Sequence, residues 1–75
     1  MLVMMTKTLG QRLKERRLAM QLTVKQAAEM LNMTERGYRY LEADEKRPSI
    51  ETAVKIEDRF GISIREMVND AEHSA

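Results

Sequence analysis

Residues 23–42, with the sequence TVKQAAEMLNMTERGYRYLE, decide the fold of this chain. Thr23 is followed three residues later by Gln26, the spacing of a capping box that satisfies two backbone amides at a helix start. Thr34 is a second residue of the type preferred at an N-cap. Asn32 adopts the left-handed conformation that reverses a chain at lower cost than most residues. The segment therefore predicts two short helices joined by a tight turn.

The apolar residues of this segment are expected on facing sides of the two helices. Ala27, Ala28 and Leu31 face Tyr38 and Leu41, and the small alanines allow a close crossing. Tyr38 is expected in the core, with its hydroxyl at the rim. Two short helices in this arrangement form a helix-turn-helix, which places its second helix in the DNA major groove.

The composition limits the class of protein. The chain has 75 residues, 43% hydrophobic and 33% charged, which is typical of one small globular domain rather than a disordered segment. It contains no cysteine, so a disulfide framework and thiolate metal sites are excluded. No stretch approaches the ~20 apolar residues of a membrane span. We expect a cytoplasmic protein with no membrane association, cofactor or metal.

The charges are unevenly distributed although the net charge is only +1. Ten basic and six acidic residues lie between Lys7 and Arg47, whereas three basic and six acidic residues follow from Pro48 onward. This polarity is typical of a protein that binds a polyanion through one face. Random scatter of surface charge is the alternative.

Periodicity and capping residues predict an all-α fold of five helices. The first covers about residues 8–20, and the next two are the pair described above. A fourth helix is capped by Ser49 and runs to Phe60, and Gly61 follows it in the left-handed conformation. A short fifth helix covers about residues 63–69 and begins with a capping box of Ser63 and Glu66. The expected core positions outside the helix pair are Leu9, Leu13, Met20, Ile50, Ala53, Ile56 and Phe60. We expect residues 1–7 to form a flexible leader, 8–69 the domain, and 70–75 a frayed tail.

Several stretches in order resemble the lambda repressor/Cro-like helix-turn-helix domains of the XRE family over residues 9–68. They are LGQRLKERR at 9–17, Ala28, Asn32 and Met33 around the turn, Tyr38, Leu41 and Glu42, RPSIET at 47–52, and FGIS at 60–63. The resemblance implies a five-helix domain with the helix-turn-helix at about 23–42. It also implies a structural ion pair between Arg17 and Glu42. Contact of Arg17 with DNA is the alternative.

Matching to the family motif assigns the base contacts to the second helix of the pair. Arg36 can pair with N7 and O6 of guanine, and Arg39 can read a base or bind phosphate. Glu35 can accept from cytosine or favour the positive helix N-terminus. Tyr40 can contact a thymine methyl, donate to phosphate, or cover the following loop.

The expected phosphate contacts lie on either side of that helix. They are Thr23, Lys25, Lys46, Arg47 and Ser49. Three departures from the family pattern bear on DNA affinity. Val24 replaces a phosphate-binding glutamine, Gly37 lies inside the recognition helix, and Asp44 stands where a glycine is usual. With Glu45, Asp44 brings negative charge near the expected phosphate path.

The resemblance implies a sequence-specific regulator, a repressor that binds palindromic double-stranded DNA as a homodimer. Its dimer interface would include Ile62, Ile64, Met67 and Val68, although these residues can also simply close the core. An antitoxin or adaptor module that mainly binds another protein is the alternative function. No enzyme is expected, because the only histidine is His73 in the tail and no catalytic or metal-binding set of residues is present.

Overall fold

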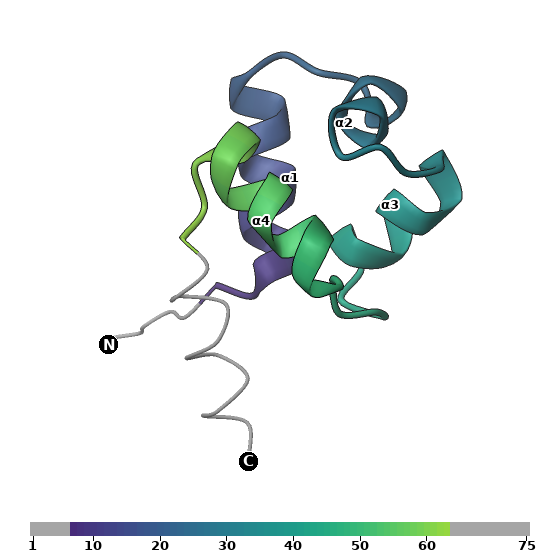
Figure 1. Cartoon of the computed structure of the whole chain (residues 1–75). Coiled ribbons are helices and arrows are strands. Elements are labelled where there is room, and N and C mark those ends of the chain that lie inside the picture. Colours follow the sequence, from purple (N-terminus) through teal and green to yellow (C-terminus); the bar gives the residue numbers. More distant parts are fainter. Residues whose placement is uncertain (1–6, 64–75) are drawn as a thin grey trace.

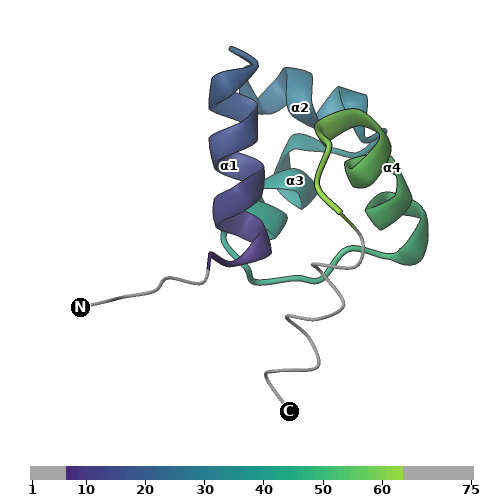
Figure 2. The ribbon, with the colours of Figure 1, turned by 90° about the vertical axis from the view of Figure 1, so that its left-hand side faces the viewer.

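The computed structural model describes residues 7–63, which contain four α-helices and no strand. The helices are α1 (Leu9–Ala19), α2 (Val24–Met30), α3 (Glu35–Glu42) and α4 (Ile50–Phe60). Figure 1 shows α2 and α3 to the right of α1 and α4, and the turned view of Figure 2 shows α1 and α4 on opposite sides with α2 and α3 between them. The all-α prediction is confirmed for these residues. The fifth helix, the leader before residue 7 and the 70–75 tail lie outside the described residues.

Each helix begins at a side-chain cap. Thr23 forms the predicted capping box with Gln26, and Thr34 accepts from the amide of Gly37 at 3.0 Å. Ser49 accepts from the amide of Thr52. The capping box that starts α1, which sequence analysis did not assign, joins Thr8 and Gln11. Local hydrogen bonding thus fixes where all four helices start.

The core fills the space between the four helices. Among residues 7–63 it contains nine buried hydrophobic residues: Leu13, Ala27, Ala28, Leu31, Tyr38, Leu41, Ile56, Phe60 and Ile62. Most of these come from α2, α3 and the segments that end them. The helix-turn-helix is therefore built into the core rather than attached to it.

Two expected core positions are wrong. Ile50 is 84% exposed, because the buried residues of α4 lie in its C-terminal half and its first turn extends beyond the core. Met20 is 38% exposed, because it is the C-cap of α1, where the chain leaves the helix. Helical spacing alone did not show where along each helix the packing against the core ends.

Three helices end in the same turn without glycine. Gln21, Asn32 and Asp44 have φ of 61°, 57° and 60°, and each lies one residue after a C-cap. In each case paired backbone hydrogen bonds close the Schellman motif that such a left-handed residue allows. The prediction for Asn32 is confirmed. Glycine has this role only after α4, at Gly61 with φ 72°.

Gln21→Gly is expected to stabilise the fold by about 0.5–1 kcal/mol. The left-handed conformation costs a side chain about 1–2 kcal/mol, which exceeds the extra entropy that glycine loses on folding. Thermal unfolding should then shift upward by about 4 °C. A lower melting temperature would show that the exposed Gln21 side chain contributes more than its backbone strain costs.

Candidate nucleic-acid interface

The inward face of α3 is held by the core and by polar contacts with α1. Tyr38 is 0% exposed and Leu41 is 3% exposed. The outer side of the same helix presents Glu35, Arg36 and Arg39 to solvent, with Tyr40 half-buried beside them. The base-contact residues predicted from the sequence therefore share one accessible side of a rigidly packed helix.

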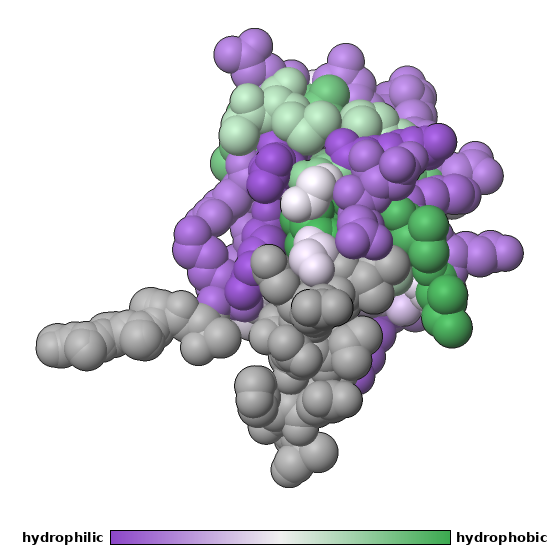
Figure 3. Space-filling model, turned by 60° about the vertical axis from the view of Figure 1, so that its left-hand side comes forward, coloured by the Kyte–Doolittle hydropathy of each residue, from purple (hydrophilic) through white to green (hydrophobic). Residues whose placement is uncertain are grey.

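The two arginines on this side have no internal partner. Within residues 7–63, the guanidinium groups of Arg36 and Arg39 form no hydrogen bond or ion pair. A charged group without an internal partner keeps its donors for a ligand, and a guanidinium is suited to paired acceptors. Hydrophilic side chains are common on this protein, and Figure 3 shows them over much of the face that it draws. It is the position on α3, more than charge alone, that distinguishes Arg36 and Arg39.

The start of α2 supplies a different kind of donor. The capping box uses the amides of Thr23 and Gln26, at 2.9 and 3.0 Å from their side-chain acceptors. As the first two residues of the helix, Val24 and Lys25 have amides with no intrahelical acceptor. The Lys25 side chain is exposed. These donors are of the kind that binds phosphate at a helix N-terminus.

The loop between α3 and α4 carries the remaining expected phosphate contacts. Lys46, Arg47 and Ser49 are exposed. Ser49 also caps α4, donating to Thr52 Oγ1 at 3.1 Å while it accepts from the Thr52 amide. The loop thus ends at a fixed helix start.

The carboxylate of Asp44, which is expected near the phosphate path, is hydrogen-bonded to the start of α1. Its Oδ2 accepts from the Thr8 hydroxyl at 2.5 Å, and its Oδ1 accepts from the Gly10 amide at 2.9 Å. Both donors belong to the start of α1. Asp44 and Glu45 are both exposed, but only Asp44 is tied to α1 by hydrogen bonds.

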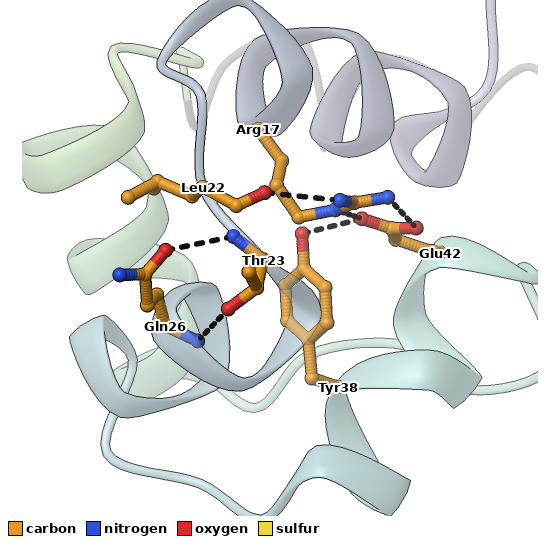
Figure 4. A network of polar contacts seen from close by, with 6 residues as sticks. All are labelled: Arg17, Leu22, Thr23, Gln26, Tyr38 and Glu42. Carbon is orange, nitrogen blue, oxygen red and sulfur yellow. Dashed lines mark hydrogen bonds and ion pairs between the residues drawn. The ribbon is translucent and has the colours of Figure 1, made fainter.

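A polar network joins α1 to the end of α3 behind the interface (Figure 4). Arg17 Nε lies 2.7 Å from Glu42 Oε2, and Arg17 Nη2 lies 3.4 Å from Glu42 Oε1. The Tyr38 hydroxyl donates to Glu42 Oε2 at 2.6 Å, and Arg17 Nη1 donates to the Leu22 carbonyl at 3.1 Å. The pair expected from the resemblance is therefore bidentate and includes a third side chain. Tyr38 lies in the core, as expected, but its hydroxyl is bonded inside the structure rather than placed at a solvent rim; its i,i+4 spacing to Glu42 was the sequence signal for this bond.

The network raises the pKa of two of its members. Burial, with the hydrogen bond to Glu42, raises the pKa of Tyr38 above its ordinary value of 10.0. The hydrogen bond to Glu42 is the main cause that raises the pKa of Arg17, while burial acts in the opposite direction. Both groups therefore keep their protons throughout the neutral range.

Stability is expected to fall above about pH 10 as Tyr38 loses its proton in the unfolded chain. Because the folded-state pKa is the higher one, the contribution of Tyr38 to stability is complete below the unfolded pKa and is lost as the pH rises. Urea unfolding at a series of pH values should show a smaller alkaline loss for Tyr38→Phe than for the unmodified chain. Equal losses would assign the effect to other groups.

Ile62 does not fit its expected place in a dimer interface. It is 5% exposed and packs in the hydrophobic core of the single chain, so its side chain is not offered to a second copy. Ile64, Met67 and Val68 lie outside the described residues. The burial of Ile62 agrees with the alternative interpretation, closure of the core.

Residues 7–63 offer neither a metal site nor a membrane-spanning helix. No group of three or more His, Cys, Asp or Glu side chains in this range could hold a metal ion. None of the four described helices has the length and hydropathy needed to cross a membrane.

An exposed recognition helix fixed on a capped turn defines a DNA-binding helix-turn-helix protein. Comparison with known families agrees with this class, since the helix-turn-helix family model of the lambda repressor/Cro-like type matches residues 13–67. The chain belongs to the XRE family of helix-turn-helix regulators, whose domains bind DNA and are not normally enzymatic. A search of curated proteins gave no significant match.

Proposed function

We propose that this chain is a sequence-specific repressor that reads double-stranded DNA through the exposed side of α3. The observation that carries the proposal is a pair of guanidinium groups just after the Thr34 cap, those of Arg36 and Arg39, which have no partner within residues 7–63. In a helix-turn-helix, the N-terminal residues of the second helix meet base edges. Arg36 is the residue we assign to guanine, while Arg39 and Tyr40 lie one turn further along.

Phosphate contacts on both sides of α3 would set the register of the protein on the duplex. We assign them to the N-terminus of α2, with Thr23 and Lys25, and to the loop that carries Lys46, Arg47 and Ser49. Such contacts position the protein without reading sequence. Glu35 then either accepts from a cytosine or stabilises the N-terminus of α3.

We further propose that two copies bind a palindromic operator and occlude a promoter. A single small domain makes few base contacts, and a two-fold dimer doubles them over half-sites about 34 Å apart. Selection of bound fragments from a random DNA pool tests this directly. A palindromic consensus supports the dimer, whereas a single half-site with monomeric complexes contradicts it.

Arg36→Ala and Lys46→Ala are expected to weaken binding in different ways. Loss of a bidentate contact to guanine should reduce affinity for the selected sequence by about 1–3 kcal/mol and relax the preference at one base pair. Loss of a phosphate contact should weaken all sequences alike and reduce the slope of log K against log salt by about one unit. Fluorescence anisotropy over a salt series measures both quantities. Indifference of binding to both substitutions would overturn the assignment.

The alternative function is an antitoxin or adaptor that uses the same fold mainly to bind a protein. The exposed apolar side chains of Ile50 and Val54 on α4 are the observation in its favour. Absence of DNA binding at low salt, together with a stable protein complex, would select this alternative.

A further inference from the structure

We propose that Asp44 is a positioning residue that holds the loop between α3 and α4 in place for phosphate contact. The inference rests on the proposed function, because it assumes that Lys46 and Arg47 meet the DNA backbone. It assigns to this acidic residue a favourable role in binding a polyanion, the opposite of what its charge suggests.

The side chain of Asp44 ties the end of α3 to the start of α1. The carboxylate accepts from Thr8 Oγ1 at 2.5 Å and from the Gly10 amide at 2.9 Å. Gly10 is buried, and its amide is among the first of α1, which have no acceptor within the helix. Asp44 therefore supplies an acceptor that the fold needs at this point.

The backbone of Asp44 is held as firmly as its side chain. Its φ is 60°, and its amide donates to the Leu41 carbonyl at 3.2 Å. The next amide, of Glu45, donates to the Tyr40 carbonyl at 2.9 Å. Glycine adopts this conformation more easily, but glycine has no side chain that can reach α1.

The loop is short between its two fixed ends. It is tied to α1 at Asp44 and ends at the Ser49 cap of α4. Between these points lie only residues 45–48, and the ring of Pro48 restricts its own φ. Lys46 and Arg47, which are exposed, therefore have a limited range of positions. Restricting that range in the free protein reduces the ordering cost of binding.

The charge of Asp44 is compensated where it lies. Two hydrogen bonds reach the carboxylate, and it lies at the N-terminus of α1, where a helix favours negative charge. Glu45, one residue later, is exposed and has no side-chain hydrogen bond or ion pair within residues 7–63. The neighbouring acids, both exposed, thus provide a matched pair, one tied to α1 by hydrogen bonds and one without such bonds.

The test compares Asp44→Gly, Asp44→Asn and Glu45→Gln with the unmodified chain on a random-sequence 30-bp duplex of about three helical turns. Phosphate contacts need no particular sequence, so this probe measures them directly. Asp44→Gly keeps the left-handed backbone and removes the tie. Asp44→Asn keeps the tie to α1, since the amide oxygen of asparagine can accept from the Gly10 amide and its amide nitrogen can donate to Thr8 Oγ1. Circular dichroism checks that each variant is folded.

We expect Asp44→Gly to weaken binding about fivefold to tenfold and to lower the salt slope by up to about one unit. Asp44→Asn should bind at least as tightly as the unmodified chain, and Glu45→Gln should bind more tightly. Adding Lys46→Ala and Arg47→Ala to Asp44→Gly should cost less than adding them to the unmodified chain, because the loop contacts are already impaired. A purely structural role would change stability without this non-additivity.

If Asp44→Gly binds DNA as tightly as the unmodified chain, or more tightly as expected for Glu45→Gln, the inference about Asp44 is overturned. The proposed function is then unaffected. Additive effects with the two loop substitutions also overturn the inference. If the unmodified chain shows no salt-dependent DNA binding, the proposed function fails and the inference fails with it. The salt series on the unmodified chain therefore distinguishes the two failures.

Discussion

Glu42→Ala is expected to destabilise the fold by about 3–5 kcal/mol. The substitution leaves the Arg17 guanidinium without its carboxylate and the Tyr38 hydroxyl without its acceptor. The side chains of Arg17 and Glu42 are only 11% and 13% exposed, so water cannot fully replace the lost partner. A domain of this size has roughly 4–11 kcal/mol of total stability, of which this is a large part. Urea unfolding followed by circular dichroism measures the loss.

An exposed ion pair in the same chain gives the matched control. Lys7 and Glu15 lie 2.8 Å apart, with side chains 55% and 58% exposed. Glu15→Ala should therefore cost less than about 1 kcal/mol, because solvent screens the pair and hydrates the remaining charge. Comparable losses for the two substitutions would contradict the conclusion that burial makes the Arg17–Glu42 pair important. Glu42→Gln can keep hydrogen bonds but not the charge, so its loss of stability should lie between those of Glu42→Ala and Glu15→Ala.

Local sequence signals predicted several of the helix starts and turns correctly, although they did not assign the Thr8–Gln11 capping box or the left-handed Gln21 and Asp44. The capping box of Thr23 and Gln26, the cap at Thr34, the left-handed Asn32 and Gly61 were all read from residues within four positions of one another. Such features depend on backbone geometry over a single turn, which residue type strongly constrains. The family resemblance added the one long-range contact expected in advance, between Arg17 and Glu42.

Apart from two local bonds, Thr8–Gln11 and Tyr38–Glu42, the contacts missed by sequence analysis join residues far apart in the chain. Asp44 bonds Thr8 and Gly10 across more than 30 positions, and Arg59 Nη1 donates to the Met30 carbonyl across 29. No local pattern of residue types distinguishes an acid that faces solvent from one that accepts from a distant helix start. The exposure of Ile50 was missed for a related reason, since helical spacing gives a face but not the extent of the neighbouring helix.

The exposed residues of the candidate interface could be predicted from the sequence, but the hydrogen bonds that position its loop could not. Helical periodicity places Arg36 and Arg39 away from Tyr38 and Leu41, and the structure has them exposed. The sequence did not show that the acidic residue beside the phosphate-binding loop is tied to α1. Under the proposed function, tertiary hydrogen bonding decides whether that charge opposes or assists DNA binding.

Gly10→Ala is expected to destabilise the fold by about 2–3 kcal/mol, even though alanine favours a helix by up to about 1 kcal/mol over glycine. A Cβ at this position would overlap the backbone carbonyl oxygen of Glu42 and lie 2.8 Å from Asp44 Oδ2. The backbone oxygen cannot move by changing a rotamer, so α1 must shift away from the end of α3. That shift would lengthen the hydrogen bond between the Gly10 amide and Asp44 and disturb the nearby Arg17–Glu42 pair. Thermal unfolding should show a melting temperature lower by about 10 °C or more.

Gly37→Ala provides the control for this prediction, because the same change meets only side-chain atoms. A Cβ at Gly37 would lie 3.2 Å from Thr34 Oγ1 and 3.3 Å from Met33 Cε. The methionine end can rotate away and the threonine can yield slightly, so the gain in helix propensity should offset most of the crowding. We expect a change of less than about 1 kcal/mol, of either sign. An equally mild effect of Gly10→Ala would show that α1 has room to move. It would contradict the conclusion that the close approach of α1 to α3 requires glycine at residue 10.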